Sequence, residues 1–166
     1  MTRNFLNCTK YRRCCDKIPE VFYILYGQDD FSLHQAVGRI KDSLGNAEML
    51  AVNTTSLDSE HLTLKELKHN CNVAPFLSPH RLVIVKSLLG RFEPRQRKSR
   101  ISSHAIAKSE NELGEWQGLD SYIKQMPQTT VLILVDGKIS SYNPLLKKLS
   151  PLAKTKTFPL LRGKSL

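Results

Sequence analysis

The chain has 166 residues, 40% of them hydrophobic, so it can bury one core but is too short for two domains of ordinary size. Its formal net charge of +10 favours a polyanionic or acidic partner without choosing between nucleic acid, an anionic surface and an acidic protein. No apolar run reaches the length of a membrane span and the N-terminus lacks a signal-peptide core, so we expect no membrane contact and a cytoplasmic location.

The chain begins with a basic segment, 1–19, that has no sustained hydrophobic period, and we expect it to form a flexible arm. The domain proper is expected over 20–166. Its first element is VFYILY (21–26), a continuous β-branched and aromatic run that is typical of a strand buried on both faces. Gly27 ends this strand.

A helix is expected to start at Asp29 or Asp30, since either side chain can cap it, and to stop at Gly45. Its apolar stripe is formed by Leu33, Val37, Ile40 and Leu44. A weaker strand is expected at 48–52, followed by a polar turn at 53–59.

The next predicted helix carries Leu64, Leu67 and Cys71 on one face and ends before Pro75. RLVIV (81–85) is a second compact strand, and a basic loop is expected at 91–100.

Residues 113–126 have helical spacing, and Pro127 separates them from TTVLILV (129–135), the strongest strand pattern in the chain. Pro144 opens a last helix, and a final strand is expected at 155–158. Strands that alternate with helices predict an α/β domain: a doubly wound, mainly parallel five-stranded sheet with helices on both faces.

A doubly wound domain usually binds ligands beyond the carboxyl ends of its strands, where the first turn reads GQDDFS (27–32). A phosphate-binding loop needs several glycines, whose N–H groups surround the phosphates, and a Lys followed by Ser or Thr. Here one glycine precedes two acids, which cap a helix well and would repel a triphosphate. We therefore predict a structural turn without nucleotide-binding residues.

Other chemistry-bearing residues form no catalytic pattern. Lys86 and Ser87 stand where a nucleotide hydrolase places acids, and Asp136 beside Gly137 is interpreted as a turn residue that hydrogen-bonds its own backbone. The scattered histidines are His34, His61, His69, His80 and His104, and the irregularly spaced cysteines, expected to be free thiols, are Cys8, Cys14, Cys15 and Cys71. We predict no catalytic residue, no metal site and no cofactor.

The triplet Pro75, Phe76 and Leu77 is the most informative group, because it is apolar and is bounded by Ser78 and Pro79. Such a triplet is either the top of a core strand or a hydrophobic wedge offered to a partner. The order of elements favours the wedge, an aromatic side chain at the mouth of a nucleotide fold that lacks its phosphate chemistry.

Together these segments resemble the N-terminal domain of the delta subunit of the bacterial DNA polymerase III clamp loader. The similar segments are YILYGQDDFSLHQAVGRI (23–40), APFLSPHRLVIV (74–85), VLILVDGK with the following helix (131–149), and the tail FPLLRGKSL (158–166). The resemblance implies an AAA+ architecture without a working ATP site, because sister subunits handle ATP. It also implies that the lid and C-terminal collar domains of a full delta subunit lie outside this chain.

The resemblance further implies a module that opens the ring-shaped sliding clamp by inserting an apolar wedge, in DNA replication. The wedge maps onto Pro75, Phe76 and Leu77, with Phe76 as its anchor, although some relatives carry a larger aliphatic residue in place of Pro75. The expected partners are the sliding clamp (beta subunit), other clamp loader subunits, and DNA through the assembled loader, with no bond made or broken by this chain.

Two other hypotheses remain open. The first is a nucleic-acid-binding α/β domain that contacts phosphates with its basic residues. These are Arg91, Arg95, Arg97, Lys98 and Arg100 in the 91–108 insertion, and Lys147, Lys148, Lys154 and Lys156 near the C-terminus. The insertion can equally be a solvated loop. The second is an NTPase with an atypical site, which the missing glycines and lysine disfavour.

Overall fold

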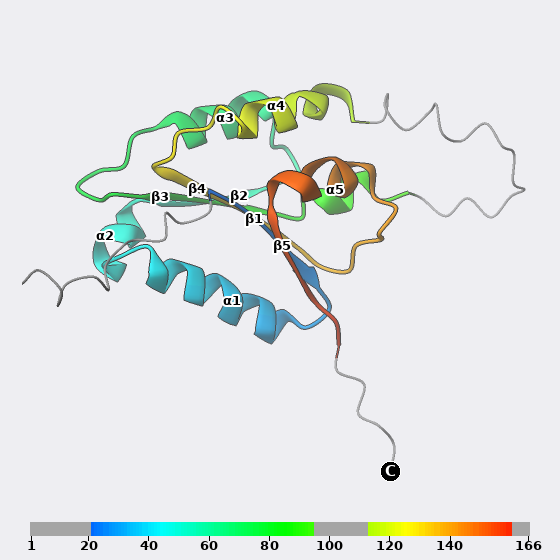
Figure 1. Ribbon diagram of the computed structural model, residues 1–166, viewed down its shortest axis with the longest axis horizontal. Helices are drawn as coiled ribbons and strands as arrows, with labels where there is room; N and C mark the ends of the chain where they lie inside the picture. The colour runs from blue at the N-terminus through cyan, green and yellow to red at the C-terminus, as the bar shows by residue number, and fades with distance from the viewer. Residues whose placement is uncertain (1–20, 95–112, 161–166) are drawn as a thin grey trace, which may run out of the picture.

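A computed structural model describes residues 21–94 and 113–160 of the chain (Figure 1). The arm predicted at 1–19 lies outside these described residues. The part of the chain that the structure describes forms one five-stranded sheet between two layers of helices, as Figure 1 shows.

All the strand pairs in this sheet are parallel. The strands are β1 (Phe22–Gly27), β2 (Thr54–Asp58), β3 (Arg81–Lys86), β4 (Thr130–Asp136) and β5 (Lys154–Phe158). Their order across the sheet is β2-β3-β4-β1-β5, so the chain winds from β1 out to β2 and returns past β1 to end at β5. The predicted doubly wound parallel α/β fold is confirmed.

Helices cover both faces of the sheet. They are α1 (Asp30–Ser43), α2 (Ala47–Val52), α3 (Leu64–Asn72), α4 (Leu119–Ile123) and α5 (Pro144–Leu149), with short 3-10 turns η1 (Leu89–Phe92), η2 (Gly114–Gly118) and η3 (Ser150–Leu152). Figure 1 shows α1 and α2 below the sheet and α3, α4 and α5 above it. Each layer closes its own hydrophobic core against the strands, one around Leu33 and Leu50 and the other around Leu67 and Trp116.

Local sequence accounts for the helix starts. Asp29 caps α1 by accepting the Ser32 backbone N–H, and the Ser32 hydroxyl, which donates to the same carboxylate, holds the pKa of Asp29 below its usual range. Thr63 and Glu66 form a reciprocal capping box at the start of α3.

The expected strand at 48–52 and turn at 53–59 were wrong. Residues 47–52 form α2, because Asn46 caps its first turn and Leu50 packs into the lower core, and Ala, Glu, Met and Leu all favour helix. The strand falls in the segment read as a turn, where β2 pairs with β3 along its whole length as an edge strand. Threonines favour strands on half-buried surfaces, but a five-residue edge strand has only a weak pattern of its own.

The helix expected over 113–126 is divided. Residues 114–118 form the 3-10 turn η2, and α4 follows from Leu119 to Ile123. The apolar spacing was still informative, since Leu113, Trp116 and Leu119 are all buried in the upper core.

Gly27 is predicted to be intolerant of any side chain, because a Cβ added there would lie 2.0 Å from the Phe158 carbonyl oxygen at the end of β5. Gly27→Ala must push two backbone segments apart, so we expect a loss of unfolding free energy at the upper end of the roughly 1–3 kcal/mol typical of overpacking. Urea denaturation measures it.

Gly38→Ala is the matched control. A Cβ at Gly38, inside α1, meets no atom within 4 Å, so this variant should gain roughly 0.5–1 kcal/mol. Equal stabilities of the two variants would contradict the close approach of β1 and β5.

Candidate functional site

The loop 73–80, which we call the wedge loop, joins α3 to β3 and presents its apolar side chains to solvent. Phe76 is 65% exposed and Leu77 is 75% exposed, while Pro75 is partly buried. Leu77 has a φ of 50°, in the left-handed region, so the backbone turns sharply just after the aromatic residue. The sequence reading that made this triplet part of a core strand is therefore wrong, and its use as a wedge stays a prediction.

Hydrogen bonds hold the wedge loop from beneath. The side-chain amide of Asn53 accepts the Phe76 N–H at 2.6 Å and donates to the Phe76 carbonyl at 2.8 Å. The same amide nitrogen donates to the Met49 carbonyl at 2.7 Å, so the end of α2 and the wedge loop lie side by side.

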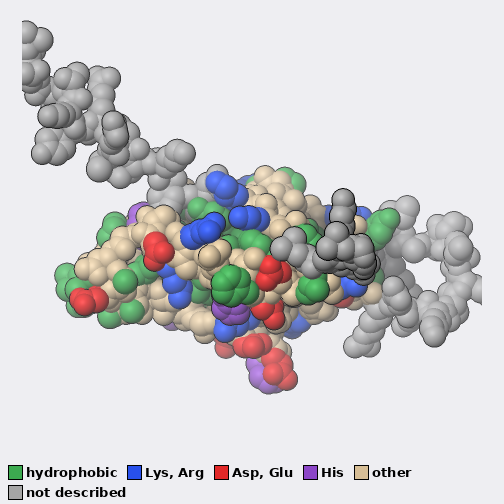
Figure 2. Space-filling model, turned by 90° about the horizontal axis from the view of Figure 1, so that it is seen from below, with side chains coloured by type: hydrophobic (Ala, Val, Ile, Leu, Met, Phe, Trp, Pro, Cys, Tyr) green, Lys and Arg blue, Asp and Glu red, His purple; other side chains and the backbone are tan. Residues whose placement is uncertain are grey.

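Further exposed apolar side chains therefore flank the triplet. Val52 is 70% exposed and Met49 is 41% exposed, and Val73 at the start of the loop is also exposed. We call Met49, Val52, Val73, Phe76 and Leu77 the wedge surface. Figure 2 shows hydrophobic side chains at the left end of the molecule, the end that carries α2 and the wedge loop in Figure 1.

Sequence reasoning missed Met49 and Val52. It assigned 48–52 to a strand, in which neighbouring side chains alternate between two faces. The helix-forming composition of 47–52 was the signal that could have found them. On α2 these residues are three apart and share one face.

The wedge surface lies at the edge of the sheet opposite to the one expected. A segment that leads into a parallel strand lies at the amino ends of the strands, and both α2 and the wedge loop lead into strands, β2 and β3. The mouth at which nucleotide folds bind their ligands lies at the carboxyl ends. The hypothesis of an aromatic residue at this mouth was therefore wrong in its placement.

At the carboxyl edge, the turn after β1 is joined to the end of β5. The backbone N–H groups of Gln28 and Asp29 both donate to the Phe158 carbonyl, at 2.9 and 3.2 Å. In a phosphate-binding loop such N–H groups would face the ligand. Here a carbonyl of the same chain occupies them.

Asp136, at the end of β4, does not hydrogen-bond its own turn as expected. It is buried and accepts the backbone N–H groups of Leu89 and Gly90, both at 3.0 Å, so it fixes η1 to the sheet. Burial raises the pKa of Asp136 to about 6, with a further contribution from nearby Glu93, although the two N–H donors oppose the rise.

Arg91 is the one member of the predicted basic loop set that lies within the described residues. Its guanidinium donates to the carbonyls of Ser59, at 2.7 Å, and Leu62, at 3.0 Å, and lies over the rings of Phe92 and Trp116. It thus contributes to packing at the carboxyl edge, far along the strands from the wedge loop. Arg95, Arg97, Lys98 and Arg100 lie outside the described residues.

The C-terminal lysines surround α5 and β5. Lys148 pairs with Asp120 at 3.3 Å, Lys147 lies over the ring of exposed Tyr142, and Lys156 lies over the Phe158 ring. Residues 137–160 contain five lysines and no Asp or Glu, and the acids that contact this segment, Asp120 and Glu93, come from other parts of the chain.

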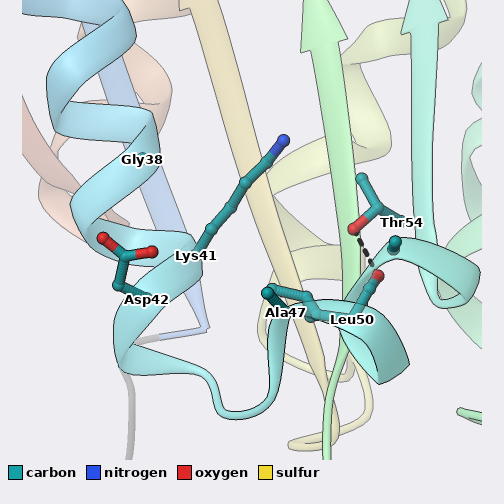
Figure 3. Close-up of a pocket in the computed structure, with 7 residues that line it drawn as sticks. Gly38, Lys41, Asp42, Ala47, Leu50 and Thr54 are labelled. Carbon is teal, nitrogen blue, oxygen red and sulfur yellow. Dashed lines mark hydrogen bonds between the residues drawn. The ribbon is translucent and has the colours of Figure 1, made fainter.

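A cavity of about 400 Å³ lies between α1 and α2, next to the first residue of β2. Its lining is Gly38, Lys41, Asp42, Ala47, Leu50, Ala51 and Thr54. Figure 3 shows Lys41 extending toward the strands while Thr54 donates to the Leu50 carbonyl at 2.7 Å. This hollow has mostly apolar walls and no convergent set of polar groups among these residues.

Cys71 is buried and free, as predicted, and burial raises the pKa of its thiol to about 12. The other cysteines lie outside the described residues. Within 21–94 and 113–160, no cluster of three or more His, Cys, Asp or Glu is placed to hold a metal ion, and no helix is long and apolar enough to cross a bilayer.

The strand order and the turn closed by Phe158 define the class: a doubly wound parallel α/β domain with an exposed apolar loop at its amino edge. A family model described as DNA polymerase III, delta subunit, matches residues 23–158. The chain belongs to this family.

Two relatives agree with this assignment. The DNA polymerase III subunit delta of Bacillus subtilis (strain 168) is 27% identical over 113 residues, which cover 68% of this chain and 29% of that protein. The solved Bacillus subtilis DNA clamp loader delta protein superposes with a TM-score of 0.64 at 26% identity, covering 86% of this chain and 39% of that one. The chain thus matches well under half the length of either relative.

Asp136→Asn is predicted to change the free energy of unfolding by an amount that depends on pH, because Asp136 takes up a proton in the wild type and Asn cannot. Because the folded-state pKa is raised above that of the unfolded chain, the folded state binds the proton more tightly, and the contribution of Asp136 to stability falls as pH rises from about 4 to about 6. Relative to wild type, Asp136→Asn should therefore gain on the order of 2 kcal/mol between pH 4 and pH 7.

Urea unfolding of both proteins at these two pH values checks this expectation. Asp120→Asn is the control, because the backbone N–H of Ser121 and the ammonium of Lys148 lower the pKa of Asp120 and so reverse the sign. A stability difference between Asp136→Asn and wild type that is the same at both pH values would contradict the raised pKa.

Proposed function

We propose that this domain binds a sliding clamp through its wedge surface and acts as the clamp-opening module of a bacterial replicative clamp loader. Family membership and the name of the solved relative, a DNA clamp loader delta protein, support a role in loading clamps during replication. The observation that carries the proposal is the exposure of Phe76 and Leu77 on a loop that is hydrogen-bonded to the buried side chain of Asn53.

Exposed apolar side chains that are contiguous and held in place are typical of protein-binding surfaces. An aromatic anchor that enters a pocket on a partner commonly contributes at least about 2 kcal/mol to binding. Met49 and Val52 extend the apolar area beside this anchor, so the proposed clamp contact includes α2 as well as the predicted triplet.

Opening a closed ring requires more than tight binding. A protein shifts a conformational equilibrium only by as much as its affinity differs between the two states, so the wedge must bind the distorted or open clamp better than the closed one. The domain therefore acts by binding energy alone, in the cytoplasm, alongside loader subunits that use ATP, and we assign it no catalytic residue.

Phe76→Ala tests the anchor. We expect the affinity for the sliding clamp encoded by the same genome to fall at least about 30-fold, which corresponds to about 2 kcal/mol. Surface plasmon resonance with immobilised clamp measures the change.

The chain offers a matched control in Phe31, which is 77% exposed but lies in the first turn of α1, away from the wedge loop. Phe31→Ala should bind the clamp as wild type does. Equal affinities of wild type and Phe76→Ala would remove the proposed anchor.

A second candidate function is contact with nucleic acid through the C-terminal lysines. The observation that favours it is the basic, acid-free stretch 137–160, in which exposed Tyr142 lies beside Lys147. Lysines of this kind bind phosphates without reading sequence, and binding then weakens as salt rises. In the assembled loader this surface would supply a contact to DNA.

Lys147→Ala/Lys156→Ala tests this candidate. If both lysines contact phosphates, the slope of log K against log salt for duplex DNA should become less steep by about 1.8, since each contact contributes about 0.9. Fluorescence anisotropy at several salt concentrations measures the slope. Lys65→Ala, which changes an exposed lysine next to Glu66 on α3, should leave it unchanged, and an unaltered slope in the double variant would exclude the contact.

A further inference from the structure

Asn53 is the residue that joins the wedge loop to the body of the domain. Only 1% of its surface is exposed, yet it lies between two segments whose side chains are largely in solvent, α2 and the wedge loop. Its backbone is also fixed, because its N–H donates to the Leu50 carbonyl and its carbonyl accepts the Leu82 N–H, both at 3.0 Å. The side-chain amide therefore projects from a rigid position.

The Asn53 amide is matched to the Phe76 backbone in both directions. Its oxygen accepts the Phe76 N–H and its nitrogen donates to the Phe76 carbonyl, while the second N–H of the amide donates to Met49. An amide has two donor hydrogens and one acceptor oxygen, and every one of these groups is used. Among the common side chains, only one with a short stem and a terminal amide makes this set of contacts from this position.

The wedge loop has little else to fix its centre. The elements that flank it are held, since Tyr122 donates to the Asn72 side chain at 2.8 Å and Arg81 donates to the Asn70 carbonyl at 2.9 Å. Near its end, the Ser78 hydroxyl donates to the His80 carbonyl at 3.1 Å. The Phe76 side chain is mostly exposed, so its packing contributes little to holding the loop. The pair of hydrogen bonds to Asn53 is the constraint that remains at the aromatic residue.

We infer that Asn53 is a positioning residue: it holds Phe76 in the conformation that the clamp binds, and so raises affinity without contacting the clamp. This inference rests on the proposed clamp-binding function. A loop that takes up its binding conformation only part of the time has an apparent affinity reduced by that fraction. If removal of the amide lowers the competent fraction to about one tenth, the affinity falls about tenfold.

The test combines Asn53→Ala with Phe76→Ala in a double-mutant cycle on clamp affinity, using the 166-residue chain. We expect Asn53→Ala to weaken binding about tenfold in the wild-type background and to change it little once the Phe76 ring is gone. A general structural defect would lower affinity in both backgrounds, and that result, or unchanged affinity of Asn53→Ala, would overturn the inference.

Two further variants sharpen this test. Asn70→Ala, which removes an amide that bonds within α3, should bind as wild type does. Asn53→Asp keeps the volume and the acceptor for the Phe76 N–H but directs a carboxylate oxygen at two carbonyls, so it should weaken binding too. It replaces Asn53→Ala if circular dichroism finds the latter unfolded, and wild-type affinity of Asn53→Asp would overturn the inference.

Hydrogen exchange at the Phe76 amide separates this inference from the proposed function. The amide should exchange slowly in the wild type without any clamp and quickly in Asn53→Ala. If wild type fails to bind the clamp, the proposed function fails. The exchange rates still decide whether Asn53 fixes the conformation of the loop at Phe76. Fast exchange in the wild type would overturn the inference.

Discussion

Parallel pairing is the constraint on which this molecule depends. Since every strand runs in the same direction, all the turns that follow strands meet at one edge of the sheet and all the segments that enter strands meet at the other. The apolar groups of the wedge surface and the closed turn after β1 are thereby kept at opposite ends of the same strands. The two edges can therefore differ in chemistry. One exposes apolar side chains, while at the other the Phe158 carbonyl accepts the N–H groups of Gln28 and Asp29.

The two edges are stabilised by different interactions. At the carboxyl edge, buried Asp136 fixes η1, and the Phe158 carbonyl accepts the N–H groups of the turn after β1, so these polar groups are satisfied inside the chain. At the amino edge, one buried amide from Asn53 satisfies the wedge-loop backbone and leaves the side chains of Phe76 and Leu77 in solvent. At Phe76 the backbone polar groups are thus paired while the side chain stays exposed, which is the arrangement that a protein partner can use.

Much of the fold could be predicted from the sequence because its central strands are long, apolar runs bounded by clear turn residues. The runs at 21–26, 81–85 and 129–135 have strong patterns because those strands are buried on both faces. The short helix α2 was predicted as a strand and the edge strand β2 as a turn, since a helix of six residues and a strand with one neighbour each bury few side chains and so leave a weak periodicity.

The candidate site was predictable only in part, for a related reason. Pro75, Ser78 and Pro79 marked a turn, and a turn that contains Phe76 and Leu77 suggested exposure. The partner of that turn is Asn53, 23 residues earlier, and a hydrogen bond across that separation has no local signature. Likewise, Asp136 resembled an ordinary turn residue, because its partners Leu89 and Gly90 come from another strand's exit.

The junction of Gln28 and Asp29 with the Phe158 carbonyl has a mechanical consequence. It ties the end of β5, the last described strand, to the turn after β1, so a force applied to the backbone at Phe158 acts on β1 as well. A displacement of Phe158 is therefore passed through β1 and β4 to β3, the strand that the wedge loop enters.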